Sequence, residues 1–478
     1  MTSPAPHESS AQRRRELVAR RLRAAGISDA RAKPDTAIPR RSDPRRAPLS
    51  FAQQHAWSYQ QAHPDSVANN LCLVLTATGT LDLDALGTAF AAVVDRHEVL
   101  RTTYHADPEG EPYQYIHPTL PPPIIRVDLG TLSAPARQQQ VDALVEEAVT
   151  EPFDLAKEGP LRLRFLRHSR DSHTIVLLIQ HIVWDGMTLA AISKDLRNAY
   201  ELVLLGKDPD TAVVHPQYAD YAEWEQRTWR ERPSTAEDHA YWRQRLTPPA
   251  APLALPYREG APAVPSDQGA REDRRLTGTT PSQLRELART WATTPFVVFL
   301  ACYAEVLRDR AQATDISLGT LAVDRDHPGT DRLVGNFSNP VVLRFDLAGA
   351  TDFADLVRRV QDGYEPGFVH RGYPFLPLAN ELAGHDGTGR VPFFDSLVVF
   401  VAQDIEGPDL PGVRTTWERA DNGAAQFPLV PLGLEVFVRE AGIDVQFTYS
   451  TDMFDRETVR TLLDDLDSAL RRASGTRS

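Results

Sequence analysis

A run of apolar residues at 174–179 has the length and the β-branched content of a buried strand. Polar residues follow it, among them His181 and Asp185, and from 189 to 204 apolar residues recur at helical spacing. The pattern therefore predicts a histidine where a buried strand ends and an Asp-Gly pair, Asp185 and Gly186, where a helix begins. Active sites are often built at such junctions, because the scaffold is rigid and the turn is open.

Elsewhere the spacing of apolar residues predicts strands and helices in both halves of the chain. Strands are expected at 71–78, 316–323, 340–345, 397–401, 433–438 and 443–449. Helices are expected at 83–96, 281–291, 295–307, 353–363 and 455–472, with one more in 235–270 ahead of a Pro/Ala-rich passage.

The length of 478 residues exceeds one ordinary hydrophobic core, so more than one lobe is expected. We expect an N-terminal lobe at 48–230 and a C-terminal lobe at 231–478, preceded by a separate segment at 1–47. Within that segment, residues 10–25 place apolar residues among arginines and predict a short amphipathic helix. Residues 28–47 are rich in Pro and Arg and are typical of an extended linker.

Composition excludes several classes of function. The net charge of −13 argues against a nucleic-acid partner, which would need a basic surface. No window is apolar for long enough to span a bilayer, and the N-terminus lacks an apolar signal core, so we expect a cytoplasmic protein. We also expect a monomer. The sequence shows no metal-ligand spacing and no Gly-rich phosphate loop. Cys72 and Cys302 stand in apolar contexts and are interpreted as small core residues.

The seven residues at 180–186, Gln-His-Ile-Val-Trp-Asp-Gly, resemble the His-His-x-x-x-Asp-Gly signature of the condensation domains of nonribosomal peptide synthetases. These domains belong to the chloramphenicol-acetyltransferase-like superfamily. Other blocks match the same family in the same order, and the resemblance covers roughly residues 46 to 470. The blocks lie at 49–57, 96–104, 218–224 and 333–339, with weaker matches at 373–375 and 391–395. In the first block, His55 and Ala56 depart from the family's Arg-Leu.

The resemblance implies an α/β (α+β) fold in which two chloramphenicol-acetyltransferase-like lobes form a V-shaped pseudo-dimer, with the active site in the tunnel between them. It implies an acyltransferase whose donor is an acyl or aminoacyl thioester on the 4′-phosphopantetheine of a partner acyl or peptidyl carrier protein. The acceptor is then an amine or a hydroxyl, on a small molecule or on a second carrier protein, and the chain itself binds no cofactor. The basic segment at 10–25 either attracts an acidic carrier protein or is simply a solvated helix. The initiator Met fits a free-standing enzyme or the first domain of a longer chain.

The same resemblance assigns roles to the residues of the motif. His181 is the catalytic residue, because a neutral imidazole can accept a proton from the attacking nucleophile. Asp185 either caps the following helix or forms a buried ion pair, and the resemblance favours the ion pair, with Arg325 as the first candidate partner and Arg344 as the second. Gly186 either lets a substrate approach the main chain or adopts an unusual backbone conformation.

Gln180 is the main departure from the motif, because the family has histidine there. Glutamine cannot become cationic or accept a proton near neutral pH, but it keeps the hydrogen bonds of a structural residue, so we expect activity to be retained. Trp184 either walls the substrate channel or belongs to the core. The other residues expected to line the channel are Asn336, Ser338, Asn339 and Gln426.

Three other functions compete with condensation. A non-catalytic platform that recruits a carrier protein or a tailoring enzyme is favoured by Gln180 and opposed by the retained His181 and Gly186. Epimerisation fits less well, because the blocks at 50–53 and 96–102 resemble condensation domains more closely. Heterocyclisation domains carry an aspartate in place of the histidine.

Overall fold

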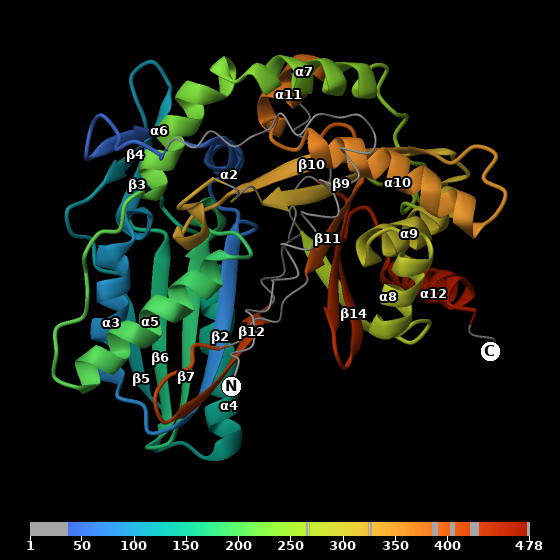
Figure 1. The fold of residues 1–478 in the computed structure, drawn as a ribbon. Helices are drawn as coiled ribbons and strands as arrows, with labels where there is room; N and C mark the ends of the chain where they lie inside the picture. The colour runs from blue at the N-terminus through green and yellow to red at the C-terminus, as the bar shows by residue number, and fades with distance from the viewer. Residues whose placement is uncertain are drawn as a thin grey trace, which may run out of the picture.

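The computed structural model describes residues 37–263, 266, 268–323, 325, 327–384, 391–401, 407–420 and 430–475. In this part of the chain two α/β lobes lie side by side, joined at the top of Figure 1 and diverging below it. The fold expected from the sequence is therefore confirmed. The helix predicted at 10–25 lies outside the described residues, as does most of the predicted linker.

A five-stranded sheet forms the centre of the first lobe. Its strands are β2 (Asn70–Gly79), β5 (Ile124–Asp128), β6 (Leu161–Ser169), β7 (Ser172–Gln180) and β12 (Val413–Ala420). Their order is β12-β2-β7-β6-β5, and all neighbours are antiparallel except the parallel pair β5 and β6. The helices of this lobe are α3 (Leu83–Arg96), α4 (Ala134–Thr150) and α5 (Thr188–Leu204). In Figure 1, α3 and α5 lie together over one face of the sheet.

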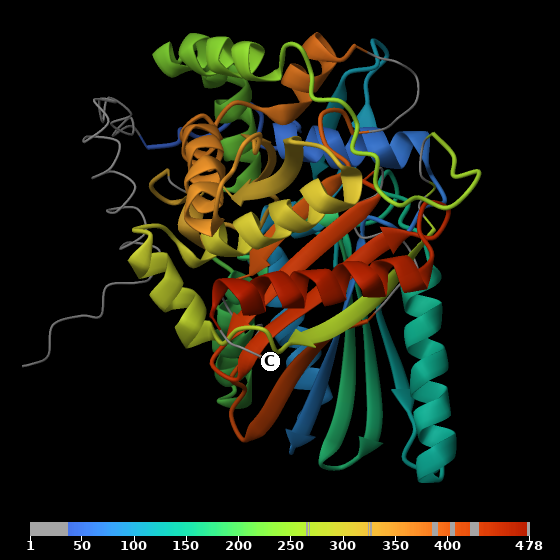
Figure 2. The same cartoon turned by 90° about the vertical axis from the view of Figure 1, so that its right-hand side faces the viewer.

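A six-stranded sheet forms the centre of the second lobe. Its strands are β8 (Gly269–Leu276), β9 (Asp315–Val323), β10 (Ser338–Asp346), β11 (Ser396–Val401), β13 (Leu432–Arg439) and β14 (Gly442–Ser450). Their order is β10-β9-β11-β13-β14-β8. The helices are α8 (Pro281–Thr290), α9 (Pro295–Ala311), α10 (Phe353–Val369), α11 (Phe375–Leu382) and α12 (Arg456–Ala473). The sheet and α9 supply most of one hydrophobic core, on which α12 packs (Figure 2).

The remaining elements lie around the junction of the lobes. They are α2 (Phe51–Ala62), α6 (Tyr218–Thr228), α7 (Pro233–Leu246), a small sheet of β1 (Arg46–Pro48), β4 (Pro112–Ile116) and β3 (Thr102–Ala106), and the short helices η1 (Glu98–Arg101), η2 (His181–Val183), η3 (Trp229–Glu231) and η4 (Thr330–Arg332). In Figure 1, α7 crosses the top of the molecule toward α11.

The division expected at residue 230 is not followed by every segment. β12 comes late in the chain, yet it pairs antiparallel with β2 and completes the sheet of the first lobe. Leu333, Val334 and Phe337 also pack in the core of the first lobe, although they precede β10 in the second. The physical reason is that the first lobe has an apolar surface at the junction, which segments from the second half of the chain cover.

Most predicted elements lie within a few residues of the observed ones, but the helix expected to end at residue 363 continues to Val369. The helix continues although it contains Gly363 and Pro366, two residues that disfavour helices. Gly363 has a packing role in this helix. A Cβ there would lie 2.6 Å from the carbonyl oxygen of Arg344, so only glycine allows α10 to pack this closely on β10.

The two cysteines lie in the core, as their apolar contexts indicate. Cys72 and Cys302 are buried and unbonded, and burial raises the pKa of the Cys72 thiol to about 12. No single helix of the described residues is long and apolar enough to cross a bilayer, and α8 and α9 pass such a test only as a pair bent by 95°.

Candidate active site

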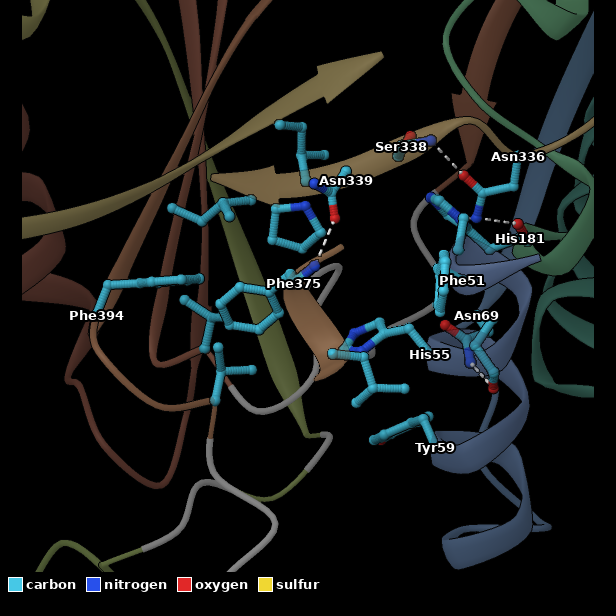
Figure 3. A pocket seen from close by; sticks show the side chains of 18 residues that line it. Phe51, His55, Tyr59, Asn69, His181, Asn336, Ser338, Asn339, Phe375 and Phe394 are labelled. Atoms are coloured by element: carbon cyan, nitrogen blue, oxygen red, sulfur yellow. Dashed lines mark hydrogen bonds between the residues drawn. The ribbon is translucent and has the colours of Figure 1, made fainter. Parts of the chain in front are cut away.

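A pocket lies between the two lobes and takes one wall from each (Figure 3). The wall from the first lobe consists of one face of α2 together with Asn69 and His181. The opposite wall comes from β9, β10, α11 and β11 and is largely apolar, with Leu321, Phe375 and Phe394 among its residues. The empty space is about 940 Å³, counting the part open to solvent, which is in the size range of small-molecule sites.

His181 is held where β7 passes into η2. Its main-chain N–H donates to the carbonyl of Asn69 at 2.7 Å, and the amide of Asn69 in turn donates to the carbonyl of Ala56 in α2 at 3.4 Å. Gln180 is fully buried, and its side-chain oxygen accepts from the N–H of Ile182 at 2.6 Å. Gln180 therefore lies outside the pocket and closes the turn that carries the histidine.

The imidazole of His181 is neutral at physiological pH. Its pKa is lowered to about 4, chiefly by burial and also by the charge of Arg419, while a hydrogen bond to its own main chain and the charge of Asp185 act in the opposite direction. The amide nitrogen of Asn336 donates to the carbonyl of His181 at 3.0 Å and lies 3.3 Å from Nδ1 of the ring. The orientation of this amide is fixed because its oxygen accepts from the N–H of Ser338 at 3.0 Å. Within the described residues, His181 Nε2 has no hydrogen-bond partner, so it is available to a substrate.

Asp185 fulfils both roles considered for it. Its Oδ1 accepts from the N–H groups of Met187 at 2.9 Å and Thr188 at 3.0 Å, at the start of α5. The same carboxylate forms a bidentate ion pair with Arg325, at 2.9 and 3.0 Å, and Oδ2 also accepts from the N–H of Phe337 at 3.2 Å. The first candidate partner is thus confirmed by the structure.

Every N–H group of the Arg325 guanidinium donates a hydrogen bond, and the bonds to Asp185 link the two lobes. Besides the pair with Asp185, Arg325 donates to the carbonyls of Thr330 at 2.8 Å, Leu333 at 2.6 Å and Gly335 at 3.1 Å. The side chains of the pair are 4% and 0% exposed, so both charges are removed from water. A buried pair with all its hydrogen bonds made fixes the loop at 330–337 against the first lobe.

The prediction of Arg344 as the second candidate partner of Asp185 is wrong. Arg344 pairs with Asp315 at 2.6 Å and donates to the carbonyls of Arg245 and Pro248. It lies six residues along β10 from Ser338, and at about 3.3 Å per residue this places it roughly 20 Å from the pocket end of the strand. Arg344 therefore ties α7 to the second lobe and does not support the site.

Trp184 and Gly186 do not line the pocket. Trp184 is buried in the hydrophobic core of the first lobe, which decides between the two interpretations of its role. Gly186 is exposed, a Cβ there would meet no atom within 4 Å, and its backbone lies outside the left-handed region. Of the two roles considered for Gly186, a left-handed backbone conformation is therefore not found.

Of the five residues considered for the channel, Asn336, Ser338 and Asn339 lie in the pocket wall (Figure 3). The amide of Asn339 donates to the carbonyls of Arg371 and Tyr373 and accepts from the N–H of Phe375. Asn339 therefore holds the start of α11. Gln426 lies outside the described residues.

Comparison with known proteins shows the family to which the chain belongs. The model of the condensation-domain family matches residues 44–476. The chain belongs to this family. Phosphinothricin tripeptide synthetase PhsC of Streptomyces viridochromogenes is 32% identical over 453 residues, which cover 94% of this chain and 41% of that protein. This condensation domain spans less than half the length of each of the first curated relatives that it matches.

Two solved structures are similar over almost the whole chain. The X-domain of teicoplanin biosynthesis, solved in complex with OxyB, has a TM-score of 0.81 at 26% identity, covering 93% of this chain and 97% of that one. The first condensation domain of the calcium-dependent antibiotic synthetase, in complex with a substrate analogue, has a TM-score of 0.75 at 20% identity, covering 90% and 96%. The second likeness shows the fold alone.

A close contact between Gly335 and Tyr218 holds the loop that carries Asn336. A Cβ at Gly335 would lie 1.9 Å from the ring of Tyr218. This ring is buried, and its hydroxyl bonds to Ser50 at 2.7 Å and to the carbonyl of Asn336. The glycine is therefore required for the loop to approach α6.

Replacement of Gly335 by alanine is expected to destabilise the condensation domain by about 3 kcal/mol, because the ring or the loop must move. Urea denaturation followed by tryptophan fluorescence measures the change. Gly372→Ala is the matched control, since a Cβ there meets no atom within 4 Å. Equal denaturation midpoints for the two variants would show that the contact is not needed.

Sequence reasoning did not assign His55 to the site. It noted His55 only as a departure from the opening motif, and that departure was the available signal. His55 lines the pocket from α2, beside Ala52 and Tyr59. Asn69 was also missed, because nothing in its surroundings distinguishes it before the fold is known. Among the described residues, no group of three or more His, Cys, Asp or Glu side chains could hold a metal ion.

Proposed function

We propose that the chain transfers an acyl or aminoacyl group from the 4′-phosphopantetheine thioester of a carrier protein to an amine or hydroxyl acceptor. The product is an amide or an ester, and the free pantetheine thiol is released. The observation that supports the proposal is His181, a neutral imidazole whose Nε2 is available in a pocket between two lobes. Condensation is also the chemistry in which members of this family serve peptide synthetases.

The chemistry asks little of the chain beyond binding and one proton transfer. A thioester is already activated, so holding the two substrates together supplies much of the rate. In the proposed step, Nε2 of His181 accepts the proton as the nucleophile attacks the thioester carbon. The imidazolium then returns it to the departing thiolate. In this step the single hydrogen of the neutral ring is on Nδ1, which leaves Nε2 unprotonated. We assign Asp185 and Arg325 a positioning role.

The low pKa of His181 predicts a specific pH profile. A base must be neutral, so activity is lost as the pH falls through the pKa of the histidine, which burial lowers from 6.5 to about 4. With an alcohol acceptor, which does not itself ionise, kcat/KM should be constant from pH 8 down to about 5.5. The measurement is an initial-rate profile, taken down to the lowest pH at which circular dichroism shows the native fold. A half-maximal rate near pH 6.5 would contradict the account.

A second candidate function is a binding platform without catalysis. It is supported by the likeness to the X-domain that was solved in complex with OxyB, and by the glutamine at position 180. In that case the chain would bind a carrier protein or an enzyme, and no reaction would take place in the pocket.

One experiment separates the two functions. Purified protein is incubated with an aminoacyl-loaded carrier protein and a panel of amines and alcohols, while binding of the same carrier is measured by calorimetry. Condensation predicts a new amide or ester by mass spectrometry and release of the free carrier thiol. Carrier binding without a product from any acceptor would overturn the proposed function in favour of the platform.

A further inference from the structure

The polar side chains of the pocket fall into two groups. The side-chain amides of Asn336 and Asn339 already form hydrogen bonds with protein groups. They therefore shape the wall and contribute few free donors or acceptors to a ligand. Within the described part of the chain, the imidazoles of His181 and His55 and the hydroxyl of Ser338 are pocket-lining groups with an open hydrogen-bonding position. The proposed reaction uses His181 and leaves His55 without a role.

His55 is fixed on a rigid element that faces the pocket. α2 starts at a capping box in which Ser50 and Gln53 satisfy each other's main-chain N–H groups, at 3.0 and 3.1 Å. Phe51, His55 and Tyr59 follow at intervals of four residues and therefore share the helix face that lines the pocket. Figure 3 shows the ring of His55 directed into the pocket, between the two walls.

His55 is also fixed relative to His181. The link through Asn69 joins the carbonyl of Ala56, next to His55, to the main-chain N–H of His181. A substrate seated on His181 therefore presents its neighbouring groups to His55 at a constant position.

The surroundings of His55 define the kind of group it would recognise. The facing wall supplies apolar residues such as Leu321, Phe375, Leu376 and Phe394. A half-buried imidazole in such surroundings gains from a hydrogen-bond partner on a ligand, because leaving its polar atoms unpaired costs free energy. The residues that line the pocket include no Asp, Glu, Lys or Arg within the described part of the chain, so a charged ligand group would have no counter-ion. Burial also lowers the pKa of His55, which leaves its ring uncharged.

Resting on the proposed function, we propose that His55 determines specificity by hydrogen-bonding an uncharged polar group, a phenol, alcohol or carboxamide, carried on an aromatic or aliphatic substrate body. The body packs on the apolar wall while the polar group reaches α2. The recognised group belongs either to the donor or to the acceptor, and the chemistry is the same in both cases.

Matched substrates that differ by one hydroxyl group test this role. The donors are the N-acetylcysteamine thioesters of tyrosine and phenylalanine, and the acceptors are tyramine and phenethylamine. In the wild type, kcat/KM should favour the hydroxylated member of one pair by about tenfold or more, since a site built to bond a hydroxyl rejects the analogue that lacks it. His55→Leu should abolish this preference by slowing the hydroxylated substrate, with the other member unchanged. Gln54→Leu, one residue away on α2 and outside the pocket wall, should keep the preference.

The same compounds separate this inference from the proposed function. If the wild type forms no product, binding of the thioesters and amines is measured by calorimetry. A hydroxyl-dependent affinity that His55→Leu loses would then support recognition by His55 while the condensation activity fails. A preference that survives in His55→Leu, or no preference in either pair by rate or by affinity, would overturn the role of His55.

Discussion

Replacement of Asp185 by alanine is expected to lower the free energy of unfolding by about 3–5 kcal/mol, as found when one member of a buried ion pair is removed. The change leaves the guanidinium of Arg325 buried without its counter-ion, and it removes the acceptor for the N–H groups of Met187, Thr188 and Phe337. The midpoint of urea denaturation measures the loss. The midpoint of Asp185→Asn should fall between those of the wild type and Asp185→Ala, because one oxygen acceptor remains while the charge is lost.

A double variant shows whether the loss comes from an unpaired charge. Asp185→Leu with Arg325→Met removes both charges, so it should cost less than the sum of the two single changes. Arg358→Ala is the control, because it removes ion pairs on the exposed face of α10 and should leave the midpoint unchanged. A midpoint for Asp185→Ala equal to that of the wild type would mean that the pair does not hold the lobes together.

The local part of the site could be predicted from the sequence. The apolar run before His181 and the helical spacing after Asp185 place both residues at a strand-to-helix junction, and η2 and α5 are found there. Arg325 could be named as a candidate because the resemblance implies an arginine partner for Asp185. The role of Gly186 could not be read in the same way, because motif spacing does not show how much room surrounds a residue.

The long-range part depends on packing that no local pattern contains. The alternating residues of β12 are compatible with a strand, but only the fold shows that it joins β2 in the other lobe. Arg344 was a reasonable partner for Asp185 by sequence, but in the sheet it lies opposite Ser317 and pairs with Asp315, two residues along β9. His55 is on the pocket face because α2 packs between the lobes, and helical periodicity alone does not say which face meets the cavity.

His181→Ala is expected to reduce kcat for acyl transfer by about a hundredfold or more, the usual contribution of a general base. The residual rate reflects positioning of the two substrates, which the variant retains. The fold should persist, because Asn69 and Asn336 bond the main chain of residue 181 and not its side chain alone. His239→Ala, a histidine on α7 outside the pocket wall, should leave kcat unchanged and controls for the loss of a histidine as such.

Single-turnover transfer from a loaded carrier protein, with wild type and His181→Ala compared in parallel, tests the central claim most directly. Intact-protein mass spectrometry follows the loss of the acyl group from the carrier, and calorimetry shows that both proteins bind the carrier equally. The account predicts rapid, acceptor-dependent loss of the acyl group with the wild type and a rate at least about a hundredfold lower with the variant. Equal rates from the two proteins, or a carrier that keeps its acyl group in the presence of every acceptor, would contradict it.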